Sequence, residues 1–383
     1  MKEKLQYICS QFRIPGEILV YRWIPNGHIN EAYYVAVYNG KEVTQLLVQK
    51  INTYVFRDPV GMMRNIELIT DHIIKKEPTM EKRRRLHFRH TADRHNYVIL
   101  KDGVSVPPEG VEFFHPDGSA VEGLEFWRVY NFIECSTSFE TSGGNPDVLR
   151  MSGRAFGKFL RQLQDFDASR LIESIPHFHD TRHRLQGFFD VADADPMGRA
   201  ETCREEIGII RENRAFGETL CEMIDENRLP VRVTHNDTKT NNILFDKDSL
   251  DPLVIIDLDT CMPGLACYDF GDTIRFAACT NEEDQPDGME LDLNLMRAYT
   301  EGYMSEAGKV LTPTEAESLA IGAGVITLEL ASRFLGDYLI GDKYFRIDYA
   351  EQNLKRAQAQ LKLFVDMMKH MDEMKDIVRS FRD

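Results

Sequence analysis

Residues 235–242 read HNDTKTNN, and a second acidic stretch, VIIDLD, follows at residues 254–259. The first stretch places a carboxylate, Asp237, five residues before an amide, Asn242. A loop of this length can point the carboxylate at a hydroxyl group and return the amide oxygen to a metal ion nearby. In the second stretch Asp257 ends a β-branched run, and a carboxylate at the end of a buried strand is costly without a counter-charge such as a cation. The two stretches together predict one site that combines a base with a metal ion.

The chemistry of these side chains indicates magnesium and a nucleotide. Mg²⁺ prefers oxygen ligands and is usually held by one or two carboxylates together with phosphate oxygens. Protein kinases use H-R-D-x-x-x-x-N in the same way, with a later Asp as a second protein ligand of the metal. On this pattern Asp237 accepts the proton of a substrate hydroxyl, and Asn242 and Asp257 hold Mg²⁺. The phosphoryl donor is then expected to be ATP.

Composition narrows the class of partner. The chain has 383 residues and a formal net charge of −16, so it repels phosphate backbones and we expect no nucleic-acid partner. Residues 82–95 run against this trend with several arginines and histidines. We interpret this basic segment as a solvated face or connector, with a local site for an anion or a partner as the alternative.

Cysteine usage and hydropathy indicate a cytoplasmic enzyme. The seven cysteines are odd in number and form no C-x-x-C pair, which is typical of a reducing compartment. The N-terminal residues have no apolar core followed by a small-residue cleavage site, and no run of about 18 apolar residues occurs. We therefore expect no membrane partner and a cytoplasmic location.

The first third of the chain has the pattern of a small antiparallel sheet with one helix. The turn Asn39-Gly40-Lys41 separates two β-prone runs, which is a strong hairpin signal. Apolar residues at three- and four-residue spacings predict a helix over residues 59–76. The expected strands cover residues 18–24, 31–38, 43–51, 97–101 and 125–133.

The remainder reads as mainly helical. Helical periodicity marks residues 148–165, 199–227, 314–341 and 351–377, and the two acidic stretches interrupt it. The fold class is therefore α+β, with an antiparallel-sheet N-lobe at residues 1–133 and a larger helical C-lobe at residues 134–383. The stretch GRAFGKF at residues 153–159 is not a P-loop, because three residues separate its glycines and no hydroxyl follows the lysine. We interpret it as helix packing.

The catalytic segment also resembles a known family. HNDTKTNNILFD followed by VIIDLDTCMPGLACYDFGD is similar to the aminoglycoside phosphotransferase and choline kinase family, and most similar to its N-acetylhexosamine 1-kinase branch. The resemblance extends to LVQKIN at residues 47–52, to Trp127-Arg128 and to RFLGDYL at residues 333–339. It covers about residues 18–365 and implies a protein-kinase-like fold with two lobes.

The resemblance implies further roles, residue by residue. Lys50 matches the lysine that reaches the nucleotide phosphates, and Glu67 is its expected acidic partner on the helix at residues 59–76. Asp259 is expected to add a contact to the metal ion or to the groups around it. Asp269, in the later YDFGD, is expected to brace the catalytic loop.

Other positions are expected to bind the nucleotide through the backbone. The base is expected at Phe132 to Cys135, which includes Glu134. The loop at residues 26–30 is expected to cover the phosphates, with Gly27 in the turn and Asn30 next to a phosphate oxygen. It holds one glycine where protein kinases have G-x-G-x-x-G.

The expected reaction is transfer of a phosphoryl group from ATP to a small polyol, most closely a hexose or N-acetylhexosamine. Arg333, Asp337 and Tyr338 are the candidates for recognising its hydroxyls. A kinase for an aminoglycoside, choline, homoserine or methylthioribose is the alternative within the class. A nucleotide-binding pseudokinase and a metal-dependent glycosyltransferase, whose metal motif would be the pair Asp257 and Asp259, are the alternatives outside it.

Overall fold

The computed structural model describes residues 1–25, 29–139 and 143–382, which form two compact units. Unit 1 is Met1–Ser136 and unit 2 is Thr137–Asp383, where the sequence suggested a boundary after residue 133. Unit 1 holds a six-stranded sheet and unit 2 is mostly helical. The expected α+β class, with the sheet first, is confirmed.

The sheet of unit 1 is antiparallel throughout, with strand order β1-β2-β3-β6-β4-β5. The hairpin turn between β2 and β3 forms because Asn39 Oδ1 accepts hydrogen bonds of 3.0 Å from the backbone N–H groups of Lys41 and Glu42. Gly40 in this turn has a φ of 90°, which favours glycine. The strands are β1 (Glu17–Ile24), β2 (Glu31–Tyr38), β3 (Val43–Ile51), β4 (Val98–Lys101), β5 (Val104–Val106) and β6 (Leu124–Asn131).

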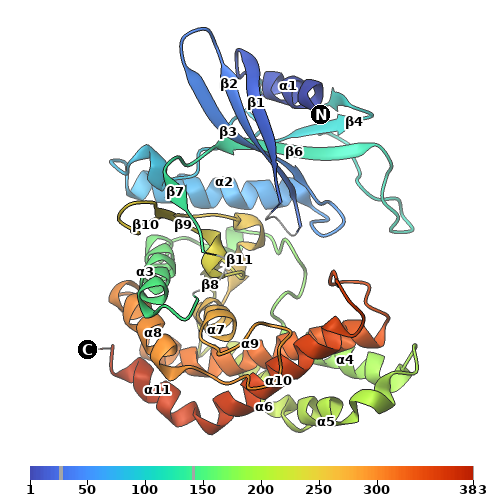
Figure 1. Cartoon of the computed structure of the whole chain (residues 1–383), viewed down its shortest axis with the longest axis vertical. Coiled ribbons are helices and arrows are strands. Elements are labelled where there is room, and N and C mark those ends of the chain that lie inside the picture. The colour runs from blue at the N-terminus through green and yellow to red at the C-terminus, as the bar shows by residue number, and fades with distance from the viewer. Residues whose placement is uncertain (26–28, 140–142, 383) are drawn as a thin grey trace. The chain divides into compact units, whose positions relative to one another are not determined.

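Two helices cover opposite faces of this sheet (Figure 1). Helix α1 (Lys2–Gln11) packs its buried residues against Val48 of β3 and Trp127 of β6. Helix α2 (Pro59–Lys76) lies on the other face, where Met63 Sδ is 3.8 Å from Nη1 of Arg128. Because side chains alternate between the faces of a strand, the neighbouring residues Trp127 and Arg128 contact different helices: Trp127 packs against α1 and Arg128 against α2.

Unit 2 is built from helices and short hairpins. The helix predicted over residues 199–227 is divided at residue 213, and the helix predicted over residues 351–377 is divided at residue 370. No helix was predicted at the positions of α4, α7 and α8. The helices are α3 (Pro146–Gln162), α4 (Thr181–Ala194), α5 (Arg204–Glu212), α6 (Arg214–Asp225), α7 (Ala266–Ala277), α8 (Leu293–Ala307), α9 (Pro313–Leu339), α10 (Gln352–Lys369) and α11 (Met371–Arg379). The short strands are β7 (Ser136–Thr137), β8 (Arg232–Thr234), β9 (Ile243–Asp246), β10 (Pro252–Ile255) and β11 (Met262–Gly264).

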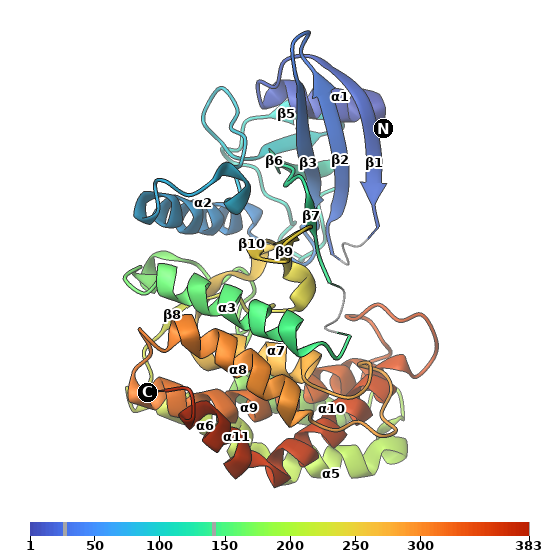
Figure 2. The ribbon, with the colours of Figure 1, turned by 60° about the vertical axis from the view of Figure 1, so that its left-hand side comes forward.

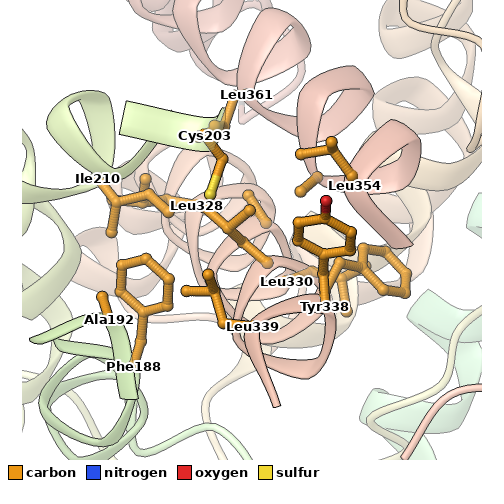
Figure 3. Packing of buried hydrophobic residues seen from close by; sticks show 14 of the residues in the cluster. Phe188, Ala192, Cys203, Ile210, Leu328, Leu330, Tyr338, Leu339, Leu354 and Leu361 are labelled. Carbon is orange, nitrogen blue, oxygen red and sulfur yellow. The ribbon is translucent and has the colours of Figure 1, made fainter. Parts of the chain in front are cut away.

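Helix α9 is the centre of unit 2. Its N-terminus is fixed by a capping box between Thr312 and Glu315. Figure 3 shows Leu328 and Leu339 of this helix packed among side chains from α4, α5 and α10. Among the described residues it alone is long and apolar enough to cross a membrane, but 78% of its apolar window is buried inside the protein, as in a core helix.

Helices α3 and α8 lie side by side because three glycines, Gly153 and Gly157 of α3 and Gly302 of α8, let their backbones meet (Figure 2). A Cβ at Gly153 would overlap the carbonyl oxygen of Tyr299, and one at Gly157 would overlap that of Tyr303. The interpretation of GRAFGKF as helix packing is therefore confirmed.

This contact predicts a difference between two Gly→Ala substitutions. Gly153→Ala is expected to lower the free energy of unfolding by about 1–3 kcal/mol, because the two helices must move apart. Gly208→Ala in α5 is the control, since a Cβ there meets nothing within 4 Å; it should raise stability by about 0.5–1 kcal/mol through helix propensity. Urea denaturation measures both, and equal effects would contradict the packing argument.

Candidate active site

The two acidic stretches are brought together by two strand pairings within unit 2. The HNDTKTNN loop joins β8 to β9, and Asp257 follows β10. β8, which precedes the HNDTKTNN loop, pairs with β11, which follows Asp257. β9, which follows the loop, pairs with β10, which precedes Asp257. The two stretches are therefore held next to each other at both ends.

Hydrogen bonds then align the two stretches residue by residue. The backbone N–H of Ile256 donates to the carbonyl oxygen of Asn242 at 2.9 Å, and His235 Nε2 lies 2.9 Å from the carbonyl oxygen of Ile256. The hydroxyl of Thr260 donates to the carbonyl oxygen of His235 at 2.7 Å. Asp257 is held between these bonds with a φ of 59°, a left-handed conformation that is uncommon for a residue with a side chain.

Asp237 is held as an ionised carboxylate. Asn242 Nδ2 donates to its carbonyl oxygen at 2.8 Å and to its Oδ2 at 3.0 Å, and Lys239 Nζ lies 3.1 Å from its Oδ1. Burial raises the pKa of Asp237, but the charge of Lys239, the His235 ring and these hydrogen bonds outweigh it, so the pKa lies below its usual value. An ionised carboxylate with a partly exposed side chain can accept a proton.

The donor set around this loop suits a magnesium ion. Because the amide nitrogen of Asn242 donates its hydrogen bonds to Asp237, the side-chain oxygen Oδ1 of Asn242 is the atom that can bind a cation. Asp257 offers carboxylate oxygens, whereas Asp259 is only 1% exposed. The described residues contain no cluster of three or more His, Cys, Asp or Glu side chains able to hold a metal by themselves. This arrangement fits Mg²⁺ that is bound jointly with phosphate oxygens.

Two buried carboxylates of α7 support the catalytic loop. Asp269 accepts hydrogen bonds from the backbone N–H groups of His235 at 2.8 Å and Asn236 at 2.7 Å. Asp272, one turn later, accepts from the backbone N–H of Thr238 at 2.8 Å. The bracing role that the resemblance implied for Asp269 is confirmed. Burial raises the pKa of Asp269 to about 6 despite the opposing effect of the His235 ring and the two backbone hydrogen bonds.

Lys239, Asp272 and Arg275 were not singled out from the sequence. Lys239 lies two residues after Asp237, and this D-x-K spacing was the available signal. Arg275 Nη2 pairs with Asp272 Oδ1 at 2.6 Å, so the cation compensates the buried carboxylate that holds Thr238. Only the helical spacing of 269, 272 and 275 could have connected them, and α7 itself was not predicted.

Within unit 1, the predicted ion pair between Lys50 and Glu67 is not formed. Lys50 Nζ instead lies 3.2 Å from Glu125 and 3.6 Å from Glu31, while Glu67 pairs with His90 at 3.1 Å. The reason is strand alternation: Lys50 lies opposite Glu31 and has the parity of Val48, so it faces α1, whereas Glu67 is on α2. The phosphate-binding role of Lys50 itself stays a prediction.

The α2 face of the sheet carries a different cation. Arg128 is 2% exposed, and its Nε donates to Gln49 Oε1 at 2.9 Å. Its guanidinium also lies over the rings of Phe88 and Tyr130. Of the pairs formed by neighbours on β3 and β6, Gln49 with Arg128 faces α2 and Lys50 with Trp127 faces α1.

The backbone expected to bind the base already makes several hydrogen bonds. The N–H of Phe132 donates to the carbonyl oxygen of Gln45 at 3.1 Å. Arg83 Nη2 donates to the carbonyl oxygens of Glu134 and Cys135 at 3.4 and 3.1 Å, which gives one arginine of the basic segment a structural role. The carboxylate of Glu134 also accepts from the side chain of Gln45.

One residue of the expected phosphate loop has a structural contact. Asn30 Oδ1 accepts a hydrogen bond of 2.9 Å from the backbone N–H of Asn52, so it joins the start of β2 to the end of β3. Gly27 lies outside the described residues. The nucleotide roles of Gly27, Asn30, Phe132 and Glu134 stay predictions.

Asp337, one of the three candidates for binding the acceptor, makes several hydrogen bonds within the protein. Its carboxylate accepts backbone N–H bonds of 2.8–2.9 Å from Lys343, Tyr344 and Phe345, and one of 3.0 Å from Asn353 Nδ2. These bonds close the loop that follows α9.

Tyr338 also packs into the protein. It is 6% exposed in the apolar core around α9, with the guanidinium of Arg199 4.6 Å from the centre of its ring. Both side chains are thus largely enclosed by the protein, and the acceptor-binding roles of Asp337, Tyr338 and Arg333 stay predictions.

Arg333 lies against three aromatic rings, with its guanidinium 5.2–5.8 Å from the centres of Phe178, Tyr344 and Phe345. One turn earlier on α9, Glu329 Oε1 lies 3.0 Å from His179 Nδ1. His179 Nε2 is buried and has no hydrogen-bond partner among the residues that the structure describes. Sequence analysis did not select His179 or Glu329, because neither belongs to a motif.

The comparison with known proteins identifies the family. The phosphotransferase enzyme family matches residues 66–307, which is more than half of the chain. The chain belongs to this family. It is an enzyme, and the matched residues include the loop at residues 235–242.

Solved structures share the fold at low sequence identity. A microcompartment-associated aminopropanol kinase has a TM-score of 0.57 at 14% identity, with 97% of this chain and 98% of that chain covered. Choline kinase from Cryptosporidium parvum Iowa II has a TM-score of 0.56 at 13% identity, with 99% of both chains covered. A spectinomycin phosphotransferase, solved with ADP and spectinomycin, has a TM-score of 0.50 at 14% identity, with 99% and 98% covered. At these identities the likeness shows the protein-kinase-like fold alone.

The brace of this phosphotransferase predicts the effect of Asp269→Asn. An amide offers one acceptor oxygen in place of two, so a backbone N–H of the catalytic loop is left unpaired, and turnover should fall at least about tenfold. The unfolded-state pKa of Asp269 is near 3.8 and the folded-state pKa is about 6. Its stabilising contribution is therefore full below about pH 4 and lost as pH rises through 6.

Urea denaturation between pH 4 and 8 should show this decline in the wild type and a shallower one in the Asp269→Asn variant. Identical pH slopes would contradict the raised pKa, and unchanged turnover would contradict the bracing role.

Proposed function

We propose that this phosphotransferase is an ATP-dependent kinase that transfers the γ-phosphoryl group to a sugar hydroxyl. The proposed acceptor is the anomeric hydroxyl of an N-acetylhexosamine or a related hexose. The observation that carries the proposal is the ionised Asp237, fixed by Asn242 and Lys239 in a loop that is bonded to the strand end bearing Asp257.

Each residue of the loop has a part in an in-line transfer. Asp237 orients the hydroxyl and accepts its proton as the oxygen attacks phosphorus. Lys239, which lies next to Asp237, offers a positive charge to the equatorial oxygens of the phosphoryl group during its transfer. Asn242 and Asp257 would hold Mg²⁺, with Asp259 behind them, and bound Mg²⁺ supplies charge neutralisation on the phosphates. Asp269 and Asp272 keep the loop in this shape.

The nucleotide contacts proposed in unit 1 are Lys50, Asn30 and the backbone from Phe132 to Glu134. Glu67 is not proposed as the partner of Lys50, because Glu125 and Glu31 already fill that role.

A neutral, oxygen-rich acceptor is favoured by the charges around Arg333. The pKa of Arg184 is lowered, first by burial and then by the charge of Arg333. The N–H donors of these two guanidinium groups suit sugar hydroxyls, and the nearby carboxylates of Glu329 and Asp180 offset part of their charge. An anomeric hydroxyl is also more acidic than other sugar hydroxyls, which suits an Asp base.

An amino-alcohol kinase is the second candidate. The observation that favours it is the acidic segment after α7, where Glu282 and Glu283 line a cavity of unit 2. The fold neighbours named for aminopropanol and choline share this architecture, but Glu283 is already paired with Arg275 at 3.1 Å. This pairing reduces the charge left for a cationic acceptor.

We also propose a cytoplasmic location with a nucleotide and a small hydroxyl compound as the partners. All seven cysteines are free. Burial raises the pKa of four of them, Cys9, Cys203, Cys267 and Cys279, to about 11–12, so these four are not activated thiols.

Phosphorus NMR of the product tests the proposed acceptor. With Mg²⁺-ATP and N-acetylglucosamine, N-acetylgalactosamine or a related hexose, the product is expected to be a sugar 1-phosphate. Choline and homoserine are expected to give no product. A 6-phosphate, or turnover only on an amino alcohol or aminoglycoside, would reject the proposed acceptor and leave the phosphotransferase assignment in place.

A further inference from the structure

The basic segment at residues 82–95 contains a short extended stretch that pairs with the sheet of unit 1. Phe88 forms an antiparallel bridge with Tyr130 of β6. The residues on either side of Phe88 complete the pairing through backbone hydrogen bonds of 2.7 Å to Val129 and 3.1 Å to Asn131. Among the described residues no strand pairs with the outer side of this stretch, so it forms an edge of the sheet.

Side chains of the stretch alternate between two faces. Leu86 and Phe88 are 5% and 8% exposed and pack into the protein. His87 is exposed and Arg85 and Arg89 are half-buried, and strand alternation places these three side chains together on the opposite face. Their spacing is about 7 Å, which is twice the rise per residue of a strand. We call Arg85, His87 and Arg89 the basic row.

The basic row has no carboxylate of its own. Neither of its arginines has an ion pair among the residues that the structure describes, whereas the neighbouring His90 lies 3.1 Å from Glu67. Burial lowers the pKa of His87, and the positive charges of Arg89 and Arg85 lower it further. Positive charge is therefore gathered here without compensation, on a chain whose formal net charge is −16.

The backbone within the row also has hydrogen-bonding groups that the sheet does not use. A residue at a non-hydrogen-bonded position of an antiparallel ladder directs its N–H and C=O groups away from the paired strand. Phe88 occupies such a position opposite Tyr130, and neither its N–H nor its C=O has a partner in the described part of the chain. An additional strand could exchange two hydrogen bonds with Phe88, as in β-augmentation.

These two features define the chemistry of a partner. Opposite charges on directly opposed residues of two strands stabilise their pairing, and like charges destabilise it. Carboxylates at alternate positions of an extended peptide repeat at about the same 7 Å as the basic row. A nucleic acid would offer negative charge but no peptide groups for Phe88, and the net charge of the chain repels it.

We propose that the edge at residues 85–89 binds an extended acidic segment of a partner protein, with Asp or Glu at alternate positions. The segment adds a strand outside Phe88, and its carboxylates lie opposite Arg85, His87 and Arg89. This interaction goes beyond phosphoryl transfer and does not depend on the identity of the acceptor.

Fluorescence anisotropy with the full-length enzyme tests the proposal. The probe is a short labelled peptide in which Glu and Thr alternate, and the same peptide with N-methylated Thr is the control for backbone pairing. Arg85→Glu reverses one charge of the row. Arg94→Glu is the matched control, because Arg94 is exposed in the same segment but lies in a turn beyond the extended stretch. His87→Glu is a second variant on the face of the row.

The wild type is expected to bind the alternating peptide, with affinity that falls as the salt concentration rises. Arg85→Glu and His87→Glu should each weaken binding about fivefold, because a favourable or neutral cross-strand pair becomes a repulsive one. Arg94→Glu should change the affinity by less than about twofold. N-methylation of the peptide should weaken binding about tenfold, because the carbonyl oxygen of Phe88 loses its donor.

Other results would overturn the proposal. If the wild type does not bind the alternating peptide, the edge is not a docking site. If Arg94→Glu weakens binding as much as Arg85→Glu and His87→Glu do, the segment attracts acidic ligands through its net charge alone. If N-methylation has no effect, or oligothymidylate of the same charge binds equally well, no strand is added and the assignment to a peptide fails. None of these measurements depends on turnover, so the proposed kinase activity is tested separately.

Discussion

The catalytic loop depends on the carboxylate of Asp269, which accepts two backbone N–H groups of that loop at 2.7–2.8 Å. Asn236 has a left-handed backbone with a φ of 64°, and neither N–H has a partner in a regular helix or strand. An external acceptor is therefore needed, and a buried carboxylate provides two acceptor atoms at the cost of a raised pKa.

The position of Asp269 is in turn fixed by the helical core. Helix α7 crosses α9 so closely that a Cβ at Gly271 would lie 2.7 Å from the carbonyl oxygen of Gly322. α9 is anchored by the apolar side chains around Leu328 and Leu339. The hydrophobic core therefore fixes α9, α9 fixes α7 through backbone contact, and α7 holds the loop of Asp237 through Asp269. A preorganised site requires such close support.

Much of the fold could be predicted from the sequence because its signals are local. The hairpin at Gly40 and the apolar spacing of residues 59–76 specify their elements without help from distant residues, and β2, β3 and α2 occur where they were expected. Helices α7 and α8 could not be predicted from periodicity because most of their residues are buried. A helix in that setting loses the polar face that makes its period visible.

The sequence points to the proposed catalytic residues more directly than to the residues proposed to bind substrates. Asp237, Asn242 and Asp257 follow from a spacing in one loop and one strand end. The predicted pairing of Lys50 with Glu67 failed because strand parity, which a motif does not reveal, turns Lys50 toward α1. Asp337 was selected for its polarity, yet four hydrogen-bond donors around one loop occupy its carboxylate. The pairing of His179 with Glu329 depends on tertiary contacts alone, and no motif reveals it.

The central claim is that Asp237 is the base of a phosphoryl transfer, and Asp237→Asn tests it most directly. The substitution preserves size and the contact with Asn242 but removes the proton acceptor. We predict that kcat falls by about 10²–10⁴ on the best substrate while the affinity for Mg²⁺-ATP changes little, because a general base contributes to the transition state. Near wild-type turnover in this variant would contradict the account.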